Sequence, residues 1–468
     1  MIDQVSEFQK VRNAHFIGVG GIGMSGLAEI FLQKGIQVTG SDVQASALTH
    51  RLESLGARVT LGHSSQNVGN VELVVYSAAV GPGNPEMIAA RERGILTVTR
   101  ADVLGALVRK SEAIAIAGAH GKTTTTAMVG AVLEAGGLDP TIVVGGVLPA
   151  THSNVRIGSS RWMVVEADEY DRSFLTMAPS LAVLTSVDAD HLEYYHSLDA
   201  IDDAFLTFLH LVPFDHPLLV CADDPGVRRI SPRLRRRLIT YGFAPDADIR
   251  GENIILDGLS ASATVRIHGR SQGTLQLNRP GRYHLQNALG ALAVAAALDL
   301  PLGRSIEALG QFAGVKRRFE FIGECNGVQI FDDYAHHPNE IRATLSVIPF
   351  LKDKRLIVVF QPHLFTRTRD LVDEFGRAFA EVPLYRAIVT DVYPAREQPI
   401  PGVTGELIVN AARKHGASHM VYVPDTHVVP EMIRRDLRPG DMVLTMGAGD
   451  IDKTGALLLA ILADTGAA

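Results

Sequence analysis

The sequence predicts an α/β protein with three domains, and three observations lead to this prediction. The 468 residues are too many for one hydrophobic core and, at about 100–200 residues per domain, correspond to about three domains. Short apolar runs alternate with helical patterns along most of the chain, as they do in parallel β-α-β units. Two of these runs lead into glycine-rich loops that open helices, in His15–Phe31 and in Ala113–Gly137.

The first domain is predicted to cover residues 1–110 and to be Rossmann-like. Buried strands are indicated by "HFIGVG", "QVTGSD", "VELVVYSAA" and "ILTVTR". The helical patterns between them are "GMSGLAEIFLQKG", "ALTHRLESLG" and "NPEMIAARERG". A charged break, "RKSE", ends this domain.

The central domain is predicted over residues 111–314, with a mostly parallel sheet. It begins with the strand "AIAIAG" and continues with "RWMVVEADE" and "SLAVLTSVDADH", two apolar runs that end in acids. Such runs are typical of buried parallel strands. Between Asp246 and Asn278 the pattern becomes short and alternating, which predicts a small antiparallel excursion. We expect the segment Ala288–Gly303 to form a buried, alanine-rich helix.

The C-terminal domain, residues 315–468, is predicted to be a second Rossmann-like unit. It begins near "VKRRFEFIGE", and "KRLIVVFQPH", "YRAIVTDVYP" and "DMVLTMGAG" alternate with helical segments.

Composition excludes several classes of protein. The net charge of -7 argues against a general affinity for nucleic acid. The basic cluster "RRISPRLRRRL" lacks neighbouring aromatic residues, so we interpret it as a solvated helix face. The chain has two cysteines without a CxxC motif, no signal-peptide pattern and no apolar run long enough to span a bilayer. We therefore expect a cytoplasmic protein without membrane insertion.

The first glycine loop follows the pattern G-x-G-x-x-G, with Gly18, Gly20 and Gly23 after a strand and Asp42 about twenty residues further on. A glycine loop at a helix N-terminus binds a diphosphate. NAD has a diphosphate, so an NAD-dependent oxidoreductase is one hypothesis. The loop alone does not distinguish NAD from other diphosphates.

The second glycine loop, "GAHGKT", has the chemistry of an ATP-binding loop. Glycines allow backbone N–H groups to surround phosphate oxygens, Lys122 reaches the terminal phosphates, and the hydroxyl of Thr123 is a candidate ligand for Mg²⁺. Only two residues separate Gly118 from Gly121, fewer than in G-x-x-x-x-G-K-T. A strand before the loop and a helix after it make a chance glycine turn an unlikely explanation.

Acidic residues follow the two neighbouring apolar runs, where ligands of parallel sheets bind. The first run provides Glu166, with Asp168, Glu169 and Asp171 after it, and the second provides Asp188, Asp190 and His191. We expect Glu166 and His191 to be functional.

Six motifs occur in a fixed order: "GAHGKTTTT", "EADEYDRSFL", "DADHLEYY", "FDDYAHHPNEI", "FQPHLFTRTRD" and "DVYPAREQPIPG". Together they resemble the Mur ligase family over essentially the whole chain. Within the family they are most similar to members that join L-alanine to UDP-N-acetylmuramate. The resemblance implies an ATP-dependent, amide-forming ligase of peptidoglycan precursor synthesis that works through an acyl phosphate. The alternatives are a relative with another acceptor, a non-catalytic ATP module and the NAD enzyme.

The resemblance also implies roles for residues. The first domain would hold a UDP-sugar, with contacts from Gly20, Gly21, Ile22, Gly23, Asp42 and Ser77. ATP would be bound by Gly118, Ala119, His120, Gly121, Lys122, Thr123, Thr124, Asn287, Arg318 and Asp333. Two Mg²⁺ ions would be held by Thr123, Glu166 and His191. The catalytic set would be Lys122, Glu166, His191 and Arg318, and L-alanine would meet Tyr334, His337, His363 and Arg367.

The chain departs from the family pattern at several places, one of them Ala119, where a hydroxyl residue is frequent in the ATP loop. Tyr283 and His284 replace a His-Asn pair, and Leu364 stands where some members have arginine. No lysine that could be carbamylated lies between His191 and Phe208. Asp202 or Asp203 is our candidate replacement for that ligand, if one is used. We expect a monomer or a weak homodimer.

Overall fold

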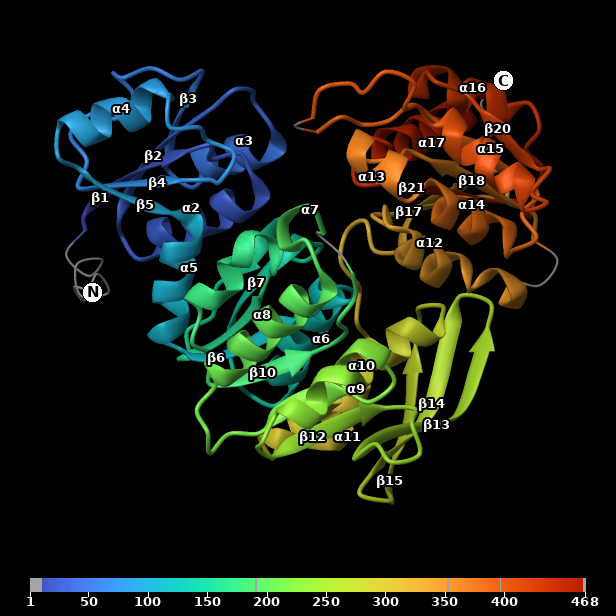
Figure 1. Ribbon diagram of the computed structural model, residues 1–468, viewed down its shortest axis with the longest axis horizontal. Coiled ribbons are helices and arrows are strands. Elements are labelled where there is room, and N and C mark those ends of the chain that lie inside the picture. Colours follow the sequence, from blue (N-terminus) through green and yellow to red (C-terminus); the bar gives the residue numbers. More distant parts are fainter. Residues whose placement is uncertain (1–10, 190–191, 352–353, 396, 466–468) are drawn as a thin grey trace. The chain divides into compact units, whose positions relative to one another are not determined.

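The computed structural model describes residues 11–189, 192–351, 354–395 and 397–465 and contains three sheets flanked by helices (Figure 1). The chain separates into two compact units. One extends to residue 253 and includes 263–275 and 286–313; the other comprises 254–262, 276–285 and the chain from 314 onwards. The prediction of an α/β fold with three domains and mostly parallel sheets is confirmed.

The first sheet has five parallel strands in the order β3-β2-β1-β4-β5. The chain order reverses between β1 and β4, and ligands of such sheets bind at the carboxyl ends of the strands at this point. All the predicted strands of this domain are present. The structure adds one edge strand, β3, whose largely exposed residues form no apolar run in the sequence. The elements are β1 (Asn13–Ile17), α2 (Ile22–Gln33), β2 (Gln37–Asp42), α3 (Ala47–Ser54), β3 (Arg58–Leu61), β4 (Leu73–Tyr76), α4 (Pro85–Glu92), β5 (Leu96–Thr99) and α5 (Arg100–Arg109).

The second sheet has ten strands in the order β15-β14-β13-β12-β11-β10-β6-β9-β7-β8. β6 lies between β10 and β9 and is parallel to both, so the loops after these three strands meet at one edge. Its elements include β6 (Glu112–Ala117), α6 (Lys122–Ala135), β7 (Thr141–Leu148), β8 (Ser153–Arg156), β9 (Trp162–Glu166), η1 (Tyr170–Thr176), β10 (Leu181–Leu184), α7 (Leu192–Tyr195), α8 (Leu198–His210), β11 (Leu218–Cys221), α9 (Pro225–Ile230), η2 (Ser231–Arg233) and β12 (Leu238–Gly242).

The predicted antiparallel excursion corresponds to β13 (Ile249–Asp257), β14 (Ser260–Ile267) and β15 (Arg270–Leu277). Two-residue turns join them, with Gly258 at φ 59° and Gly269 at φ 77°, as tight hairpins require. We expected the alanine-rich segment Ala288–Gly303 to form one helix, but it is divided between two helices. α10 (Arg282–Ala297) ends before Asp299, whose φ is 53°, and α11 (Leu302–Gly310) begins after Pro301. Proline disfavours helical conformation in the residue before it, which separates the two helices.

The third sheet has the order β16-β17-β21-β18-β19-β20, with only the β16–β17 pair antiparallel. Apolar clusters cover both of its faces: Val358 and Phe360 of β18 belong to one, and Ile357 and Val359 to the other. Strands buried on both faces read as continuous apolar runs. The elements are β16 (Glu320–Cys325), β17 (Val328–Asp333), α12 (Pro338–Leu345), η3 (Ile348–Phe350), β18 (Leu356–Phe360), α13 (Phe365–Asp370), α14 (Val372–Ala380), β19 (Arg386–Val389), α15 (Glu406–Lys414), β20 (Met420–Tyr422), η4 (Thr426–Val428), α16 (Val429–Arg434), β21 (Met442–Met446) and α17 (Asp452–Thr465).

None of the helices in the described part of the chain is long and apolar enough to cross a membrane.

Candidate active site

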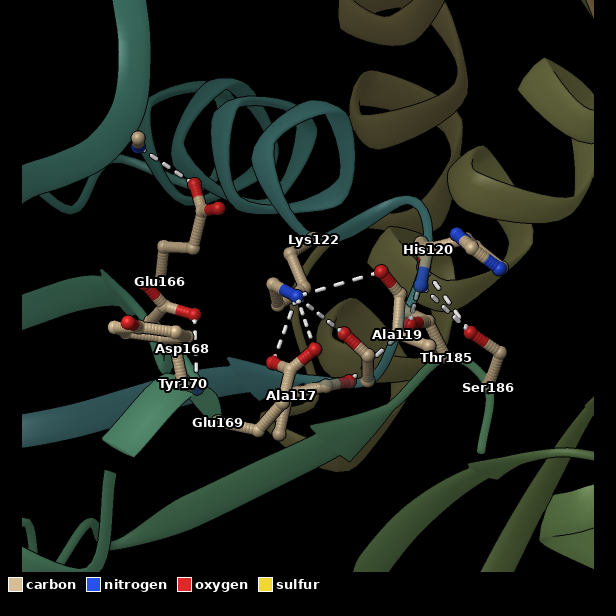
Figure 2. A network of polar contacts seen from close by, with 12 residues as sticks. Ala117, Ala119, His120, Lys122, Glu166, Asp168, Glu169, Tyr170, Thr185 and Ser186 are labelled. Carbon is tan, nitrogen blue, oxygen red and sulfur yellow. Dashed lines mark hydrogen bonds and ion pairs between the residues drawn. The ribbon is translucent and has the colours of Figure 1, made fainter. Parts of the chain in front are cut away.

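The second glycine loop connects β6 to α6 and packs on the loop after β10 (Figure 2). Gly118 has φ 137° and Gly121 has φ 82°, conformations that favour glycine. The N–H groups of Ala119 and His120 donate to the carbonyl and the hydroxyl of Ser186, at 3.1 and 2.9 Å. These two amides are therefore used to attach the loop to the sheet. The remaining loop amides, from Gly121 into α6, are at the helix N-terminus, where anions bind.

Lys122 is held by a buried acid, Glu169, for which the sequence pattern indicated no role. Its ammonium donates to both carboxylate oxygens of Glu169, at 2.8 and 2.7 Å, and to the carbonyl of Gly118 at 2.7 Å (Figure 2). Glu169 is only 3% exposed. Burial alone would lower the pKa of Lys122, but the charges of Glu169, Asp168 and Glu166, together with the hydrogen bond to Glu169, outweigh burial and raise this pKa above its usual value. Burial also raises the pKa of Glu169, and the ammonium offsets only part of that effect.

Thr123 and Glu166 lie together, as the prediction of a shared metal ion requires. Glu166 ends β9, and its Oε1 accepts a hydrogen bond from the Thr123 hydroxyl at 3.0 Å. Its Oε2 accepts from the backbone N–H of Gly145 at 2.6 Å. A hydroxyl and a carboxylate are hard oxygen donors of the kind that Mg²⁺ prefers. His191 lies outside the described residues, and within those described no group of three or more His, Cys, Asp or Glu is arranged for a metal ion.

Asn287 is near the same loop. A Cβ atom added to Gly121 would lie 2.6 Å from Oδ1 of Asn287, so this side chain contacts the turn directly before Lys122. The structure thus brings Asn287 to the predicted ATP loop from α10, more than 160 residues further along the chain.

Asp202 and Asp203 are each paired with an arginine. Asp202 is buried and accepts two hydrogen bonds from Arg229, at 2.8 and 2.7 Å, and Asp203 accepts one from Arg233 at 2.6 Å. This geometry gives no support to either aspartate as a metal ligand. It also shows that the basic cluster is not simply a solvated helix face, because two of its arginines, Arg229 and Arg233, pair with these aspartates.

The first glycine loop borders a cavity of about 380 Å³ at the switch point of the first sheet. Four of the six predicted sugar-nucleotide residues line it: Gly20, Gly21, Asp42 and Ser77. Ile22 and Gly23 are not among the lining residues; they begin α2. Other lining residues that sequence reasoning missed are Val43, Gln44, Ser46, His63, Ala79 and Val80.

Asp42 supports the loop itself, because its Oδ2 accepts a hydrogen bond from the N–H of Gly20 at 2.8 Å. In dinucleotide-binding folds, an acid about 20 residues after the glycine loop binds the ribose hydroxyl. Gly18, with φ 78°, allows the sharp turn after β1. The cavity therefore has the position and the loop expected for a diphosphate ligand.

The compact unit with the third sheet contains the predicted amino-acid residues. Rings of Tyr334, His336, His363 and Tyr393 follow one another at centroid distances of 5.2, 5.6 and 5.9 Å. The guanidinium of Arg318 lies 5.1 Å from the Tyr334 centroid. Tyr393 was not among the predicted site residues; its position after β19 brings it beside His363, which follows β18.

Two predicted residues of this unit have local structural partners. The His337 side chain caps α12 together with Glu340, in a capping box. Asp333 is buried, and its oxygens accept from the N–H groups of Phe319 and Ala335, at 2.8 and 2.7 Å. Burial raises the pKa of Asp333 to about 6 in spite of the nearby Arg318. Arg367, in α13, is half-buried.

The departure at Tyr283-His284 has a structural explanation. His284 is 2% exposed, and its Nδ1–H donates to the carbonyl of Pro280 at 2.6 Å. Burial lowers the pKa of His284 to about 4. The N–H of the His284 ring is thus used to fix the start of α10.

This burial predicts a pH-dependent loss of stability. The folded protein keeps His284 neutral, whereas the unfolded chain takes up a proton at this histidine below pH 6.5. The free energy of unfolding is therefore unaffected by this group above pH 6.5 and decreases as the pH falls from 6.5 to about 4. The expected loss is about 3 kcal/mol, from roughly 2.5 pKa units. Urea denaturation of the whole chain at pH 7, 5.5 and 4 measures it, with His284→Gln as the comparison. Equal pH slopes for the two proteins would contradict the prediction.

The fold and the two loops together define a three-domain nucleotide-binding α/β protein with a lysine-containing phosphate loop. Three family models match the chain: "Mur ligase family, catalytic domain" over residues 13–112, "Mur ligase middle domain" over 116–295 and "Mur ligase, glutamate ligase domain" over 317–449. The chain belongs to the Mur ligase family.

Individual relatives match over nearly the whole chain. A protein of Trichlorobacter lovleyi named UDP-N-acetylmuramate--L-alanine ligase is 44% identical over 454 residues, 97% of this chain and 99% of the relative. One of the same name from Solidesulfovibrio magneticus is 46% identical over 448 residues, 96% and 97% of the two chains. The crystal structure of a UDP-N-acetylmuramate-alanine ligase from Thermotoga maritima, 28% identical, superimposes with a TM-score of 0.83 over 97% of this chain and 99% of that one.

Proposed function

We propose that this chain joins L-alanine to the carboxylate of UDP-N-acetylmuramate, driven by ATP, in peptidoglycan precursor synthesis. The observation that carries the proposal is the match to relatives of that name over at least 95% of their length. The cluster of Lys122, Thr123 and Glu166 at the ATP loop supports it. Both cysteines are free thiols, in keeping with a cytoplasmic enzyme.

The proposed reaction has two steps. The muramoyl carboxylate attacks the γ-phosphate of ATP, which gives an acyl phosphate and ADP. The amine of L-alanine then attacks the acyl carbon, and phosphate leaves from the tetrahedral intermediate. Phosphoryl transfer of this kind is catalysed chiefly by positioning and charge neutralisation.

Lys122 is the principal cation for the first step. Its ammonium forms an ion pair with Glu169, and we infer that the terminal phosphates of ATP compete with this carboxylate for it. Amides at the start of α6, including those of Thr123 and Thr124, would bind phosphate oxygens. Asn287, which contacts Gly121, would border the nucleotide.

Thr123 and Glu166 would hold a Mg²⁺ ion, since their oxygen atoms are 3.0 Å apart and are hard donors. Mg²⁺ bound there neutralises charge on the β- and γ-phosphates. The backbone N–H of Gly145 orients the Glu166 carboxylate toward Thr123. From the family resemblance, His191 is our candidate for a second ion.

We assign the three predicted domains to the three substrates. Residues 1–110 would bind UDP-N-acetylmuramate in the cavity beside Gly20, Gly21, Asp42 and Ser77, and residues 111–314 would bind ATP. Residues 315–468 would bind L-alanine near Tyr334, His363 and Arg367 and contribute Arg318 to the phosphates. The contacts of His337 and Asp333 support structural roles in addition to any contact with substrate.

Phosphate release tests the proposal. We expect release from ATP to require both UDP-N-acetylmuramate and L-alanine, because the acyl phosphate needs the carboxylate and its breakdown needs the amine. Glycine and L-serine serve as competing acceptors, since one small group is worth only about 1–3 kcal/mol of discrimination. Release without the sugar nucleotide would favour an ATP module, and release only with another acceptor would favour a different family member. Absence of any NAD-dependent shift in melting temperature is also expected.

A further inference from the structure

A buried carboxylate lies next to the cavity of the first sheet without lining it. Glu86, in α4, is 0% exposed. Its Oε2 accepts from the Ser41 hydroxyl at 2.5 Å and lies 3.3 Å from Nδ1 of His63 and 3.5 Å from Nε2 of His15. Its Oε1 accepts from Asn67 Nδ2 at 2.6 Å. A carboxylate withdrawn from water requires such partners.

Glu86 is ionised at neutral pH. Burial alone would raise its pKa, but the hydrogen bonds from His15, Ser41 and Asn67 outweigh burial and lower the pKa to about 2. An ionised carboxylate only accepts hydrogen bonds. The ring nitrogen of His63 that faces it, Nδ1, must therefore carry a proton.

One partner of Glu86 lines the cavity, and another supports the glycine loop that borders it. His63 lines the cavity directly. Ser41 connects Glu86 to the glycine loop, because its carbonyl accepts from the N–H groups of Gly18 and Val19, at 2.8 and 3.0 Å. Glu86 thus holds two groups. One is the His63 side chain, which lines the cavity, and the other is Ser41 at the end of β2, which supports the glycine loop.

We propose that Glu86 is a positioning residue of the sugar-nucleotide site, which holds His63 with Nδ1 toward the protein and Nε2 for the ligand. This inference rests on the proposed function, in which the cavity binds the UDP part of the substrate. When Nδ1 carries the only ring proton, Nε2 is an acceptor for an N–H or O–H group, such as the uracil N–H or a ribose hydroxyl. Glu86 acts through His63 and Ser41 and has no contact with the ligand.

Calorimetric titration with UDP tests the proposal in wild type and in Glu86→Gln. We expect the Kd for UDP to rise about tenfold in the variant, since it loses the hydrogen bonds of a charged acceptor. The KM for UDP-N-acetylmuramate rises by the same factor, while kcat and the KM for ATP remain unchanged. A general loss of folded structure would change kcat and the KM for ATP as well as the KM for UDP-N-acetylmuramate.

The control variant is Glu29→Gln. Glu29 is a buried carboxylate of the same domain, and its partners Arg51 and Ser153 do not line the cavity. We expect Glu29→Gln to lower the melting temperature without changing the Kd for UDP. Asn67→Ala, which removes one hydrogen bond to Glu86, is the milder variant if Glu86→Gln does not fold, and a threefold to fivefold rise in Kd is expected.

A double variant tests the route of the effect. In the background of His63→Ala, the change Glu86→Gln is expected to reduce UDP affinity by less than it does alone, because the part of its effect that acts through His63 is already removed. An unchanged Kd in Glu86→Gln, with a lowered melting temperature as in Glu29→Gln, would overturn the inference and leave Glu86 a structural role. Failure of the wild type to bind UDP would instead overturn the proposed function of the cavity.

Discussion

Replacing Lys122 with alanine lowers kcat for phosphate release at least about a thousandfold. In the proposed reaction the ammonium neutralises the transferring phosphoryl group, and preorganised charge of this kind is the largest contribution to such catalysis. The measurement is ADP formation at saturating ATP, UDP-N-acetylmuramate and L-alanine. Lys34→Ala, which removes an exposed lysine of the first sheet's unit, is the matched control and retains full activity.

Stability complicates this variant, because Glu169 would be left buried without its cation. Removing one partner of a buried ion pair costs about 3–5 kcal/mol. The double variant Lys122→Ala/Glu169→Gln removes the carboxylate charge as well and is expected to regain much of the melting temperature but none of the activity. Activity in the double variant within tenfold of wild type would contradict the role of Lys122.

Replacing Glu166 with glutamine lowers kcat about a hundredfold and raises the Mg²⁺ concentration needed for half-maximal activity. Glutamine keeps the size of the side chain and its contact with Thr123, but it loses the negative charge that a hard cation requires. Phosphate release is measured over a Mg²⁺ series at saturating substrates.

The neighbouring Asp168 provides the control for this prediction. Its Oδ1 accepts from the backbone N–H of Tyr170 at 3.2 Å. Asp168→Asn is therefore expected to change the Mg²⁺ requirement less than threefold. An unaltered Mg²⁺ requirement in Glu166→Gln, or equal effects of the two variants, would remove Glu166 from the metal site.

Local patterns predicted much of the fold because each depends on near neighbours in the chain. The apolar runs that became β1, β6 and β18 are continuous because successive residues, which face opposite sides of a sheet, are buried in each of these strands. The two glycine loops were recognisable because positive φ at Gly18 and Gly121 requires glycine. The edge strand β3 was missed because its residues are largely exposed and carry no apolar signal.

In the candidate site, too, some features could be predicted from local sequence and others depend on tertiary packing. By itself, the sequence determined the fold class, the two phosphate loops and the pairing of Thr123 with Glu166, because loop motifs and strand ends are local and parallel strands bring their carboxyl ends to one edge. Only the tertiary structure decided which acid holds Lys122, which carboxylate supports His63, and that Asp202, His284 and His337 have partners within the protein. Those partners are mostly tens of residues apart, and a hydrogen bond depends on a separation of about 3 Å that is set only when the elements pack.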